Sequence, residues 1–153
     1  MDRLGKTVAE LLGDRRAVFR ISPEASVLSA LESLAEKDVG ALIVCNGERL
    51  VGIVSERDCA RKVELLGRTA RGTAVSEIMT TDVLCVTLAH TIERCVGLMA
   101  RDRLRHLPVL EDDRVVGVLS SRDVLEEMIS EDQHLIHDLE TERLRMTTNT
   151  GTY

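Results

Sequence analysis

A phrase of seven residues occurs twice in this chain, and its duplication limits the folds that the chain can adopt. Residues 52–58 read GIVSERD, and residues 117–123 read GVLSSRD. The offset is 65 residues (117 − 52), and it extends beyond the phrase, because the apolar residues of 27–35 recur in 92–100. A constant offset with matched apolar positions indicates two copies of one supersecondary unit. A unit of about 60 residues is only marginally stable alone, so we expect the copies to pack on each other.

The composition excludes several classes of function. Of the 153 residues, 44% are hydrophobic and 30% are charged, yet only Phe19 and Tyr153 are aromatic. Binding of single-stranded nucleic acid usually depends on aromatic stacking, and a net charge of −6 disfavours polyanions in general. No apolar run reaches the roughly 18 residues of a membrane span, and the start lacks a signal-peptide core. We therefore expect a cytoplasmic protein with neither nucleic-acid nor membrane partners.

The sequence contains no convincing metal site. The cysteines show no C-x-x-C spacing, which predicts reduced thiols without a metal; they are Cys45, Cys59, Cys85 and Cys95. His134 and His137 lie three residues apart on a predicted helix and could chelate a metal. Their highly charged surroundings, without a cysteine partner, favour an ordinary solvated helix face instead.

The elements predicted for each copy follow the order helix, strand, helix, strand, strand, helix. In the first copy these are 7–12, 17–21, a helix capped by Ser26 that ends near 37, a hairpin of 39–45 and 49–54, and a helix from Ser55 to about 66. The turn of the hairpin is expected at Asn46-Gly47, a pair that readily adopts positive φ. The second copy is expected at 75–79, 83–87, a helix capped by Thr91, a hairpin of 104–110 and 114–119, and a last helix ending near 129. Its turn is 111–113.

This pattern divides the chain into five parts. Residues 7–67 form the first repeat and 75–130 the second, joined by a linker at 68–74 that is rich in glycine and small residues. Residues 131–146 are predicted to be a C-terminal helix whose thin apolar stripe favours packing along a second subunit. Residues 147–153 form a polar, flexible tail.

The Ser-x-Arg-Asp corner of each copy has two interpretations. As a capping box, the serine accepts from the third amide of the helix while the aspartate accepts from the amide of the serine. As a ligand site, serine, arginine and a helix N-terminus bind phosphate, and the carboxylate accepts from both hydroxyls of a ribose. The matched arginines Arg57 and Arg122 favour the second interpretation, because capping does not require them.

At these corners the sequence resembles a tandem pair of CBS domains, named after cystathionine β-synthase, over residues 7–130. The resemblance is carried by 39–44 with 51–58, and by 104–109 with 116–123, in which an apolar strand precedes Gly, two apolar residues and Ser-x-x-Asp. The chain is similar to small stand-alone bacterial proteins of this kind. The resemblance implies an α+β fold of two pseudo-twofold related repeats, each a small mixed sheet covered by helices, with two clefts between them.

The resemblance also assigns residues to the two clefts. The Asp58 cleft would combine Ser55, Arg57 and Asp58 with residues of the second repeat, which are Thr81, Asp82, Val83, Arg105 and His106. The Asp123 cleft would combine Ser120, Arg122 and Asp123 with residues of the first repeat, which are Arg16, Ala17, Val18, Gly40 and Ala41. The implied ligands are AMP, ADP, ATP, NAD or S-adenosylmethionine. For His106 a partly buried structural role is the alternative. Cys59 stands where similar proteins often have a tyrosine, so ring stacking is not expected there.

The two clefts differ in charge at matched positions. Arg61 and Lys62 follow the first corner, whereas their counterparts are Glu126 and Glu127. One interpretation is that the Asp58 cleft binds a di- or triphosphate or a dinucleotide through Arg61 and Lys62, and that the other cleft prefers a monophosphate or binds only weakly. The alternative is that these charges are merely solvated.

The sequence therefore predicts a regulatory module that binds an adenine nucleotide and acts on an effector protein in trans or on its own dimerisation. One rival is a structural interaction module with empty clefts. The other is an enzyme acting on the nucleotide, for which no G-x-S-x-G or G-x-x-x-x-G-K-[ST] motif exists.

Overall fold

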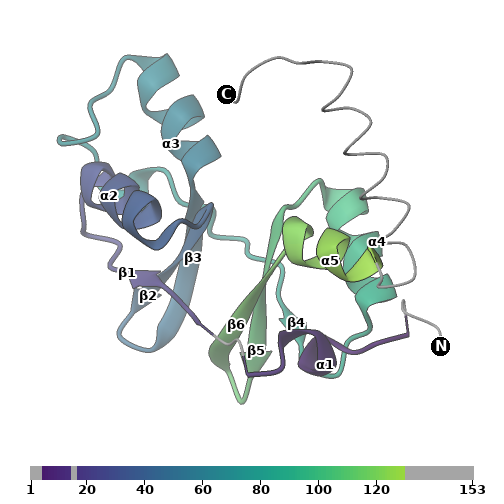
Figure 1. The fold of residues 1–153 in the computed structure, drawn as a ribbon. Helices are drawn as coiled ribbons and strands as arrows, with labels where there is room; N and C mark the ends of the chain where they lie inside the picture. The colour runs from purple at the N-terminus through teal and green to yellow at the C-terminus, as the bar shows by residue number, and fades with distance from the viewer. Residues whose placement is uncertain (1–4, 15–16, 130–153) are drawn as a thin grey trace, which may run out of the picture.

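The computed structural model describes residues 5–14 and 17–129. Arg16, the predicted C-terminal helix and tail at 131–153, and with them His134 and His137, lie outside the described residues. Two three-stranded sheets, one in each repeat, lie side by side, and helices cover their outer faces (Figure 1). The predicted α+β fold of two related repeats is confirmed.

The first repeat follows the predicted order, with shorter elements. It contains α1 (Val8–Leu12), β1 (Arg20–Ile21), α2 (Val27–Lys37), β2 (Ala41–Asn46), β3 (Arg49–Ser55), α3 (Glu56–Lys62) and the 3₁₀-helix η1 (Glu64–Leu66). Strand β2 is central, parallel to β1 and antiparallel to β3, so the sheet is mixed. The helix predicted from Ser55 to about 66 ends at Lys62, and the strand predicted at 17–21 is only two residues long.

The second repeat has the same arrangement. It contains the 3₁₀-helix η2 (Val75–Glu77), β4 (Val86–Thr87), α4 (Ile92–Asp102), β5 (His106–Glu111), β6 (Arg114–Ser120) and α5 (Ser121–Met128). Strand β5 is parallel to β4 and antiparallel to β6. The predicted helix caps are confirmed, because Ser26 Oγ accepts from the Ser29 amide and Thr91 Oγ1 from the Arg94 amide.

The 65-residue offset is preserved in the backbone itself. Ala41 pairs with Ser55 in the first sheet, and His106 pairs with Ser120 in the second. Both central strands change register at the equivalent step, between residues 44 and 45 and between 109 and 110. Helices α2 and α4 both end in a left-handed residue, Asp38 with φ 52° and Arg103 with φ 54°. The duplication therefore extends to unusual backbone conformations.

The two hairpins turn differently, and the turn predicted at Asn46-Gly47 is wrong by one residue. Asn46 is the last residue of β2, and only Gly47, with φ 64°, has positive φ in the Gly47-Glu48 turn. In the second hairpin Asp112 and Asp113 both adopt positive φ. Because Gly47 supplies the left-handed position at no steric cost, Asn46 remains free to extend the strand.

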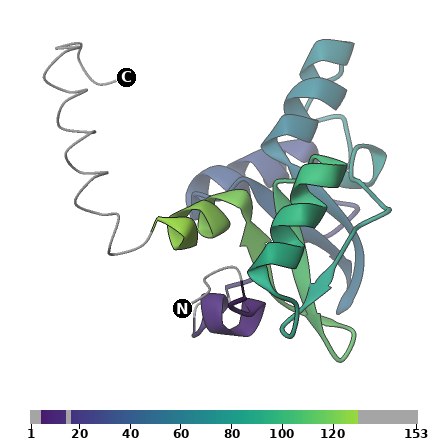
Figure 2. The same cartoon turned by 90° about the vertical axis from the view of Figure 1, so that its right-hand side faces the viewer.

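The first segment of each repeat packs in the core of the other repeat. Val8 and Leu12 of α1 are buried against residues of β4, α4, β5 and β6, and the Ile92 amide donates to the Lys6 carbonyl at 2.8 Å. Conversely, Val75 and Ile78 are buried in the core of the first repeat. Figures 1 and 2 both place α1 (purple) beside the second repeat. The repeats are therefore joined by a reciprocal crossing of their lead-in segments.

The segment predicted as a linker, 68–74, contacts the start of α2. The Val27 amide donates to the Thr73 carbonyl at 2.8 Å and the Leu28 amide to the Ala70 carbonyl at 3.0 Å. Thr73 is buried, and its hydroxyl donates to the Thr69 carbonyl at 2.7 Å. These contacts attach the connection to the first repeat along its length.

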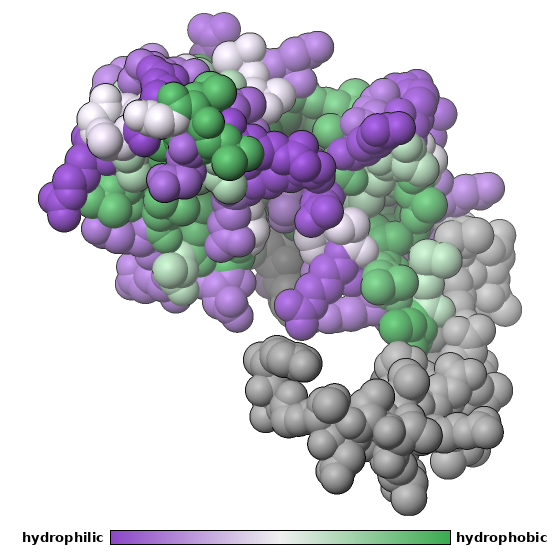
Figure 3. All heavy atoms as spheres, turned by 90° about the horizontal axis from the view of Figure 1, so that it is seen from above, coloured by the Kyte–Doolittle hydropathy of each residue, from purple (hydrophilic) through white to green (hydrophobic). Residues whose placement is uncertain are grey.

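A third apolar cluster joins the two sheets. Ile43, Cys45 and Val115 are buried in it, with partly buried residues of both repeats around them. Arg20 extends from the first repeat and donates to the Val115 carbonyl at 3.1 Å. The face seen from above in Figure 3 shows hydrophilic side chains (purple) where the repeats meet, so the junction is apolar inside and polar at this face.

The cysteines agree with the sequence prediction of reduced thiols. All four are free, and Cys45, Cys59 and Cys95 are buried. Burial raises the pKa of the Cys59 thiol, and the neighbouring Asp58 raises it further. None of the helices within residues 5–14 and 17–129 has the length and apolar character to cross a membrane.

Candidate functional site

A cleft of about 840 Å³ lies between the two repeats at the first Ser-x-Arg-Asp corner. Its first-repeat wall comes from the start of β2, the end of β3 and the start of α3, and its second-repeat wall comes from the segments before β4 and β5. The lining residues are Gly40, Ala41, Ile53, Ser55, Glu56, Arg57, Asp58, Arg61, Thr80, Asp82, Val83, Leu84, Arg103, Leu104, Arg105 and His106. This is the Asp58 cleft predicted from the sequence.

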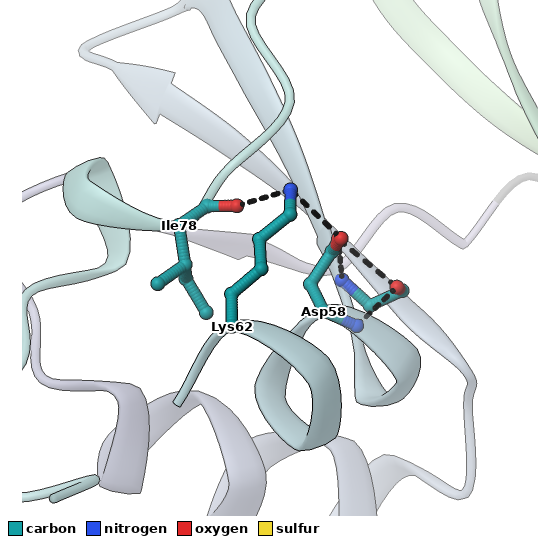
Figure 4. A network of polar contacts seen from close by, with 4 residues as sticks. Asp58, Lys62 and Ile78 are labelled. Atoms are coloured by element: carbon teal, nitrogen blue, oxygen red, sulfur yellow. Dashed lines mark hydrogen bonds and ion pairs between the residues drawn. The ribbon is translucent and has the colours of Figure 1, made fainter. Parts of the chain in front are cut away.

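The corner of this cleft forms a capping box. Ser55 Oγ accepts from the Asp58 amide at 3.1 Å, and Asp58 Oδ2 accepts from the Ser55 amide at 3.0 Å. Asp58 Oδ2 also accepts from the Ser55 hydroxyl at 3.0 Å, and Oδ1 pairs with Lys62 Nζ at 3.1 Å (Figure 4). The capping interpretation of the motif is therefore correct for the side-chain geometry at this corner.

These contacts limit how Asp58 can bind a sugar. An ionised carboxylate has about four acceptor positions, and three are already in use. A ribose diol needs two, so the Ser55 hydroxyl must turn away from Asp58 to release the second. Ser55 lines the cleft, so a hydroxyl released from Asp58 becomes available as a donor to a ligand. Both bonds of the capping box survive this rotation, because neither of them uses the hydroxyl hydrogen, so the corner can keep its cap while Asp58 binds a ribose.

The backbone amides at the start of α3 are largely occupied. The Glu56 amide donates to the Gly40 carbonyl at 3.1 Å, and the Asp58 amide donates to Ser55. Phosphate binding by free amides, which the sequence suggested, therefore has little support at this seven-residue helix. Cationic side chains are therefore better placed than backbone amides to donate hydrogen bonds to a phosphate in this cleft.

Four arginines line the Asp58 cleft, two from each repeat. Arg57 and Arg61 belong to α3, whereas Arg103 and Arg105 belong to the segment before β5. None of the four forms an ion pair with a carboxylate of the described residues, although the cleft also contains the acids Glu56, Asp58 and Asp82. Four arginines at one cleft, without a carboxylate partner among residues 5–14 and 17–129, favour an anionic ligand.

Lys62 does not line this cleft. Its ammonium lies between Asp58 Oδ1 and the Ile78 carbonyl, to which it donates at 2.9 Å (Figure 4). The sequence grouped Lys62 with Arg61 as a phosphate ligand, but the structure brings only Arg61 to the cleft.

His106 lies where the repeats touch. A Cβ atom on Gly40 would be 3.3 Å from the Cε1 and Nε2 atoms of this imidazole, so the absence of a side chain at Gly40 allows the close approach. Burial lowers the pKa of His106, Arg105 lowers it further, and Asp123 opposes both effects. The ring lines the Asp58 cleft while interacting electrostatically with the acid of the other corner.

The second cleft is smaller, about 360 Å³, and acidic. It is lined by Leu11, Leu12, Ala17, Phe19, Val39, Val118, Asp123, Glu126 and Glu127. Leu11 and Leu12 come from α1, which occupies part of this side of the molecule. The cleft has three acids and no cation among its described lining residues, so its charge is opposite in character to that of the Asp58 cleft.

The corner of the Asp123 cleft is also a capping box. Asp123 Oδ2 accepts from the Ser120 amide at 2.8 Å, and Ser120 Oγ accepts from the Asp123 amide at 3.0 Å. Arg122 is highly exposed and pairs with Glu126 at 3.2 Å, while Glu127 pairs with Lys6 at 2.8 Å. The cations near this corner are thus held by acids.

The structure divides the predicted site residues unevenly. Seven of the eight predicted for the Asp58 cleft line it, and Thr81 is replaced there by Thr80. Of those predicted for the Asp123 cleft and described by the structure, Ala17 and Asp123 line it, but Ser120, Arg122 and Val18 do not. Gly40 and Ala41 line the Asp58 cleft instead.

Sequence reasoning missed Arg103. Its sequence position, opposite Asp38 in the 65-residue alignment, would have revealed a further charge inversion between the copies. Among the described residues, no group of three or more His, Cys, Asp or Glu side chains is arranged to hold a metal ion.

Comparison with known proteins gives a consistent result. The CBS domain family model matches residues 8–65 and again 75–130. CBS domain-containing protein CBSX3, mitochondrial, of Arabidopsis thaliana is 37% identical over 111 residues, which are 69% of this chain and 54% of that protein. The chain spans about half the length of such curated relatives.

Solved structures agree in fold. The CBS domain protein NE2398 is 44% identical, with a TM-score of 0.78, covering 82% of this chain and 99% of that one. The CBS domain pair of protein MJ0100, solved with 5′-methylthioadenosine and S-adenosyl-L-methionine, is 22% identical, with a TM-score of 0.70, covering 80% of this chain and 95% of that one. Because the family model matches twice, on two repeats with the same strand order, the chain belongs to the CBS domain family and contains a tandem CBS pair.

Proposed function

We propose that this CBS pair is a regulatory module that binds an adenine nucleotide, such as AMP, ADP, ATP or NAD, in the Asp58 cleft. The observation that carries the proposal is the cleft itself, in which an acid suited to a ribose faces four arginines that have no described carboxylate partner. The bound adenosine compounds of the MJ0100 pair support the ligand class. Asp58 would bind the ribose, and the arginines would bind the phosphates.

The Asp123 cleft is proposed to remain empty of nucleotide. Its volume is less than half that of the Asp58 cleft, and its three acids repel phosphate. A nucleotide would then contact both repeats through one cleft only. It could change the protein's state only to the extent that it binds one arrangement of the repeats or subunits more tightly than another.

The effector is proposed to be a separate protein or a second copy of the chain. A homodimer whose stability depends on nucleotide is the simplest readout. A hexameric CBS-CP12 protein, 27% identical with a TM-score of 0.66, provides a precedent for assembly in a protein with this fold. Sedimentation with and without nucleotide would measure the effect on assembly.

A second candidate is an interaction module whose clefts stay empty. Both aspartates are capping residues in the structure, which accounts for their presence without a ligand. A thermal-shift panel of AMP, ADP, ATP, NAD, S-adenosylmethionine and 5′-methylthioadenosine separates the two. A ligand at 100 times its Kd stabilises the fold by about 2.7 kcal/mol, whereas an interaction module shows no shift with any of them.

The internal symmetry supplies a matched pair of variants for the same assay. Asp58→Asn and Asp123→Asn each alter one capping box, and each should cost about 1 kcal/mol of stability. Only Asp58→Asn should abolish the nucleotide-induced shift, because asparagine has one acceptor oxygen in place of two, and the Ser55 amide already uses one acceptor position. Equal ligand shifts in the two variants would contradict binding in the Asp58 cleft.

A further inference from the structure

We infer that Arg103 is a specificity-determining residue that makes the Asp58 cleft selective for ligands with two or more phosphates. The inference rests on the proposed function, since it concerns which nucleotide that cleft prefers. It is carried by the backbone conformation of Arg103, by its position opposite α3, and by the charge balance of the cleft.

Arg103 occupies an unfavourable backbone conformation. It is the left-handed C-cap of α4, with φ 54° and ψ 43°, and its amide donates to the Met99 carbonyl. Glycine is the usual residue there, and Asn or Asp the usual substitutes, because other side chains are strained in this region. At the equivalent C-cap of α2 the chain has Asp38, with φ 52° and ψ 50°. Of these two C-cap residues, Arg103 is therefore the one whose side chain does not suit the left-handed conformation.

Strained residues persist where function requires the side chain. Arg103 is exposed and lines the Asp58 cleft, and its guanidinium has no hydrogen-bonding or ionic partner among the described residues. Its twin Asp38 lines neither cleft. Both caps are left-handed, but only the one at the cleft carries a cation.

The arrangement of the arginines indicates how many phosphates the cleft accepts. Arg57 and Arg61 stand on α3 of the first repeat, and Arg103 and Arg105 stand on the second-repeat wall. A guanidinium binds phosphate best through two parallel N–H···O bonds. One phosphate provides too few oxygens for four such groups from two walls, whereas a di- or triphosphate chain can engage both pairs. A ligand of this kind would link the two repeats.

The test is calorimetric titration of AMP, ADP and ATP into four proteins: wild type, Arg103→Gly, Arg103→Lys and Asp38→Gly. Wild type should bind ADP and ATP at least tenfold more tightly than AMP. Arg103→Gly should lose roughly tenfold in ATP affinity, the loss expected for one charge-assisted contact, with a much smaller loss for AMP. Arg103→Lys should retain part of the preference.

Asp38→Gly is the matched control, because it relieves the same left-handed conformation outside the cleft. It should leave all three affinities unchanged. Neither glycine variant should melt below wild type, since glycine suits the position.

An equal loss of AMP and ATP affinity in Arg103→Gly, or no loss at all, would overturn the inference. Failure of wild type to bind any adenine nucleotide would instead refute the proposed function, so the two failures are distinguishable.

Discussion

At the scale of single residues, His106 links the two corners of the molecule. Its imidazole lines the Asp58 cleft, contacts the Gly40 position of the other repeat and interacts with Asp123. Because burial and Arg105 lower its pKa from 6.5, the folded protein favours the neutral ring. The unfolded chain takes up a proton first as the pH falls, so the folded state loses stability below about pH 6.5.

Substitution of His106 tests this linkage. Between about pH 7.5 and pH 5.5, on either side of the ordinary histidine pKa, wild type should lose more stability than His106→Gln, measured as the free energy of urea unfolding. The other three histidines are the same in both proteins, so the difference between the two profiles isolates His106. Parallel pH profiles for the two proteins would contradict the argument.

The positions of Arg103 and Lys62 relative to the Asp58 cleft could not be predicted from the sequence. The pattern Ser-x-Arg-Asp led to Arg57 and Asp58 because the motif is local. Whether Arg61 or Lys62 reaches the cleft depends on a contact with the Ile78 carbonyl, sixteen residues away along the chain. Arg103 belongs to no motif, and only its backbone conformation and the opposing wall give it a role.

At the scale of elements, each hairpin has a glycine that lies against the first segment of the opposite repeat. Gly52 in β3 lies against Met79 and Thr80, which follow η2, and Gly117 in β6 lies against Leu12 of α1. A Cβ on Gly52 would be 2.9 Å from the Thr80 carbonyl oxygen and 2.7 Å from Met79 Sδ, whereas one on Gly117 would be 2.9 Å from Leu12 Cδ1. The Ile53–Thr80 backbone bonds, 3.0 and 2.9 Å, fix the first of these approaches.

Alanine at these two positions should therefore have unequal effects. Gly117→Ala needs only a shift of the flexible end of Leu12 and should cost about 1 kcal/mol, while Gly52→Ala must displace backbone and should cost about 3 kcal/mol. Chemical denaturation of both variants measures the difference. Equal losses would show that the backbone at the Ile53–Thr80 bridge shifts as easily as a leucine methyl group.

Elements with strong local signals were predictable. The caps Ser26 and Thr91, the apolar stripes of α2 and α4, and the two hairpins follow from periodicity and turn chemistry. The strands β1 and β4 were overpredicted because only two residues of each pair with a neighbouring strand, and pairing is not encoded locally. The turn of the first hairpin lies one residue later than predicted, because Gly47 alone supplies the positive φ that the turn requires.

At the scale of the whole molecule, the reciprocal crossing makes the repeats interdependent. The core of the second repeat contains Val8 and Leu12, and the core of the first contains Val75 and Ile78. The sequence predicted that the copies pack together, but assigned 7–67 and 75–130 to separate repeats. The crossing could not be predicted, because apolar residues show that a segment is buried without showing where.

Cooperative unfolding is the expected consequence. Wild type should unfold in one urea transition, with circular dichroism and hydrogen exchange of both sheets reporting the same midpoint. Val8→Ala, at a fully buried position of α1, should reduce the free energy of unfolding by about 1–3 kcal/mol. The urea midpoint should fall equally for both repeats. A second transition, or loss confined to the second repeat, would show that the halves fold separately.

The crossing also constrains the ancestry of such a chain. A single repeat on its own polypeptide could complete its core in the same way only by exchanging its first segment with a second polypeptide. Fusion of two copies makes that exchange intramolecular. The effective concentration of each segment then no longer depends on the concentration of the protein. Once the copies are joined, either corner can mutate independently, and so one can become basic while its twin becomes acidic.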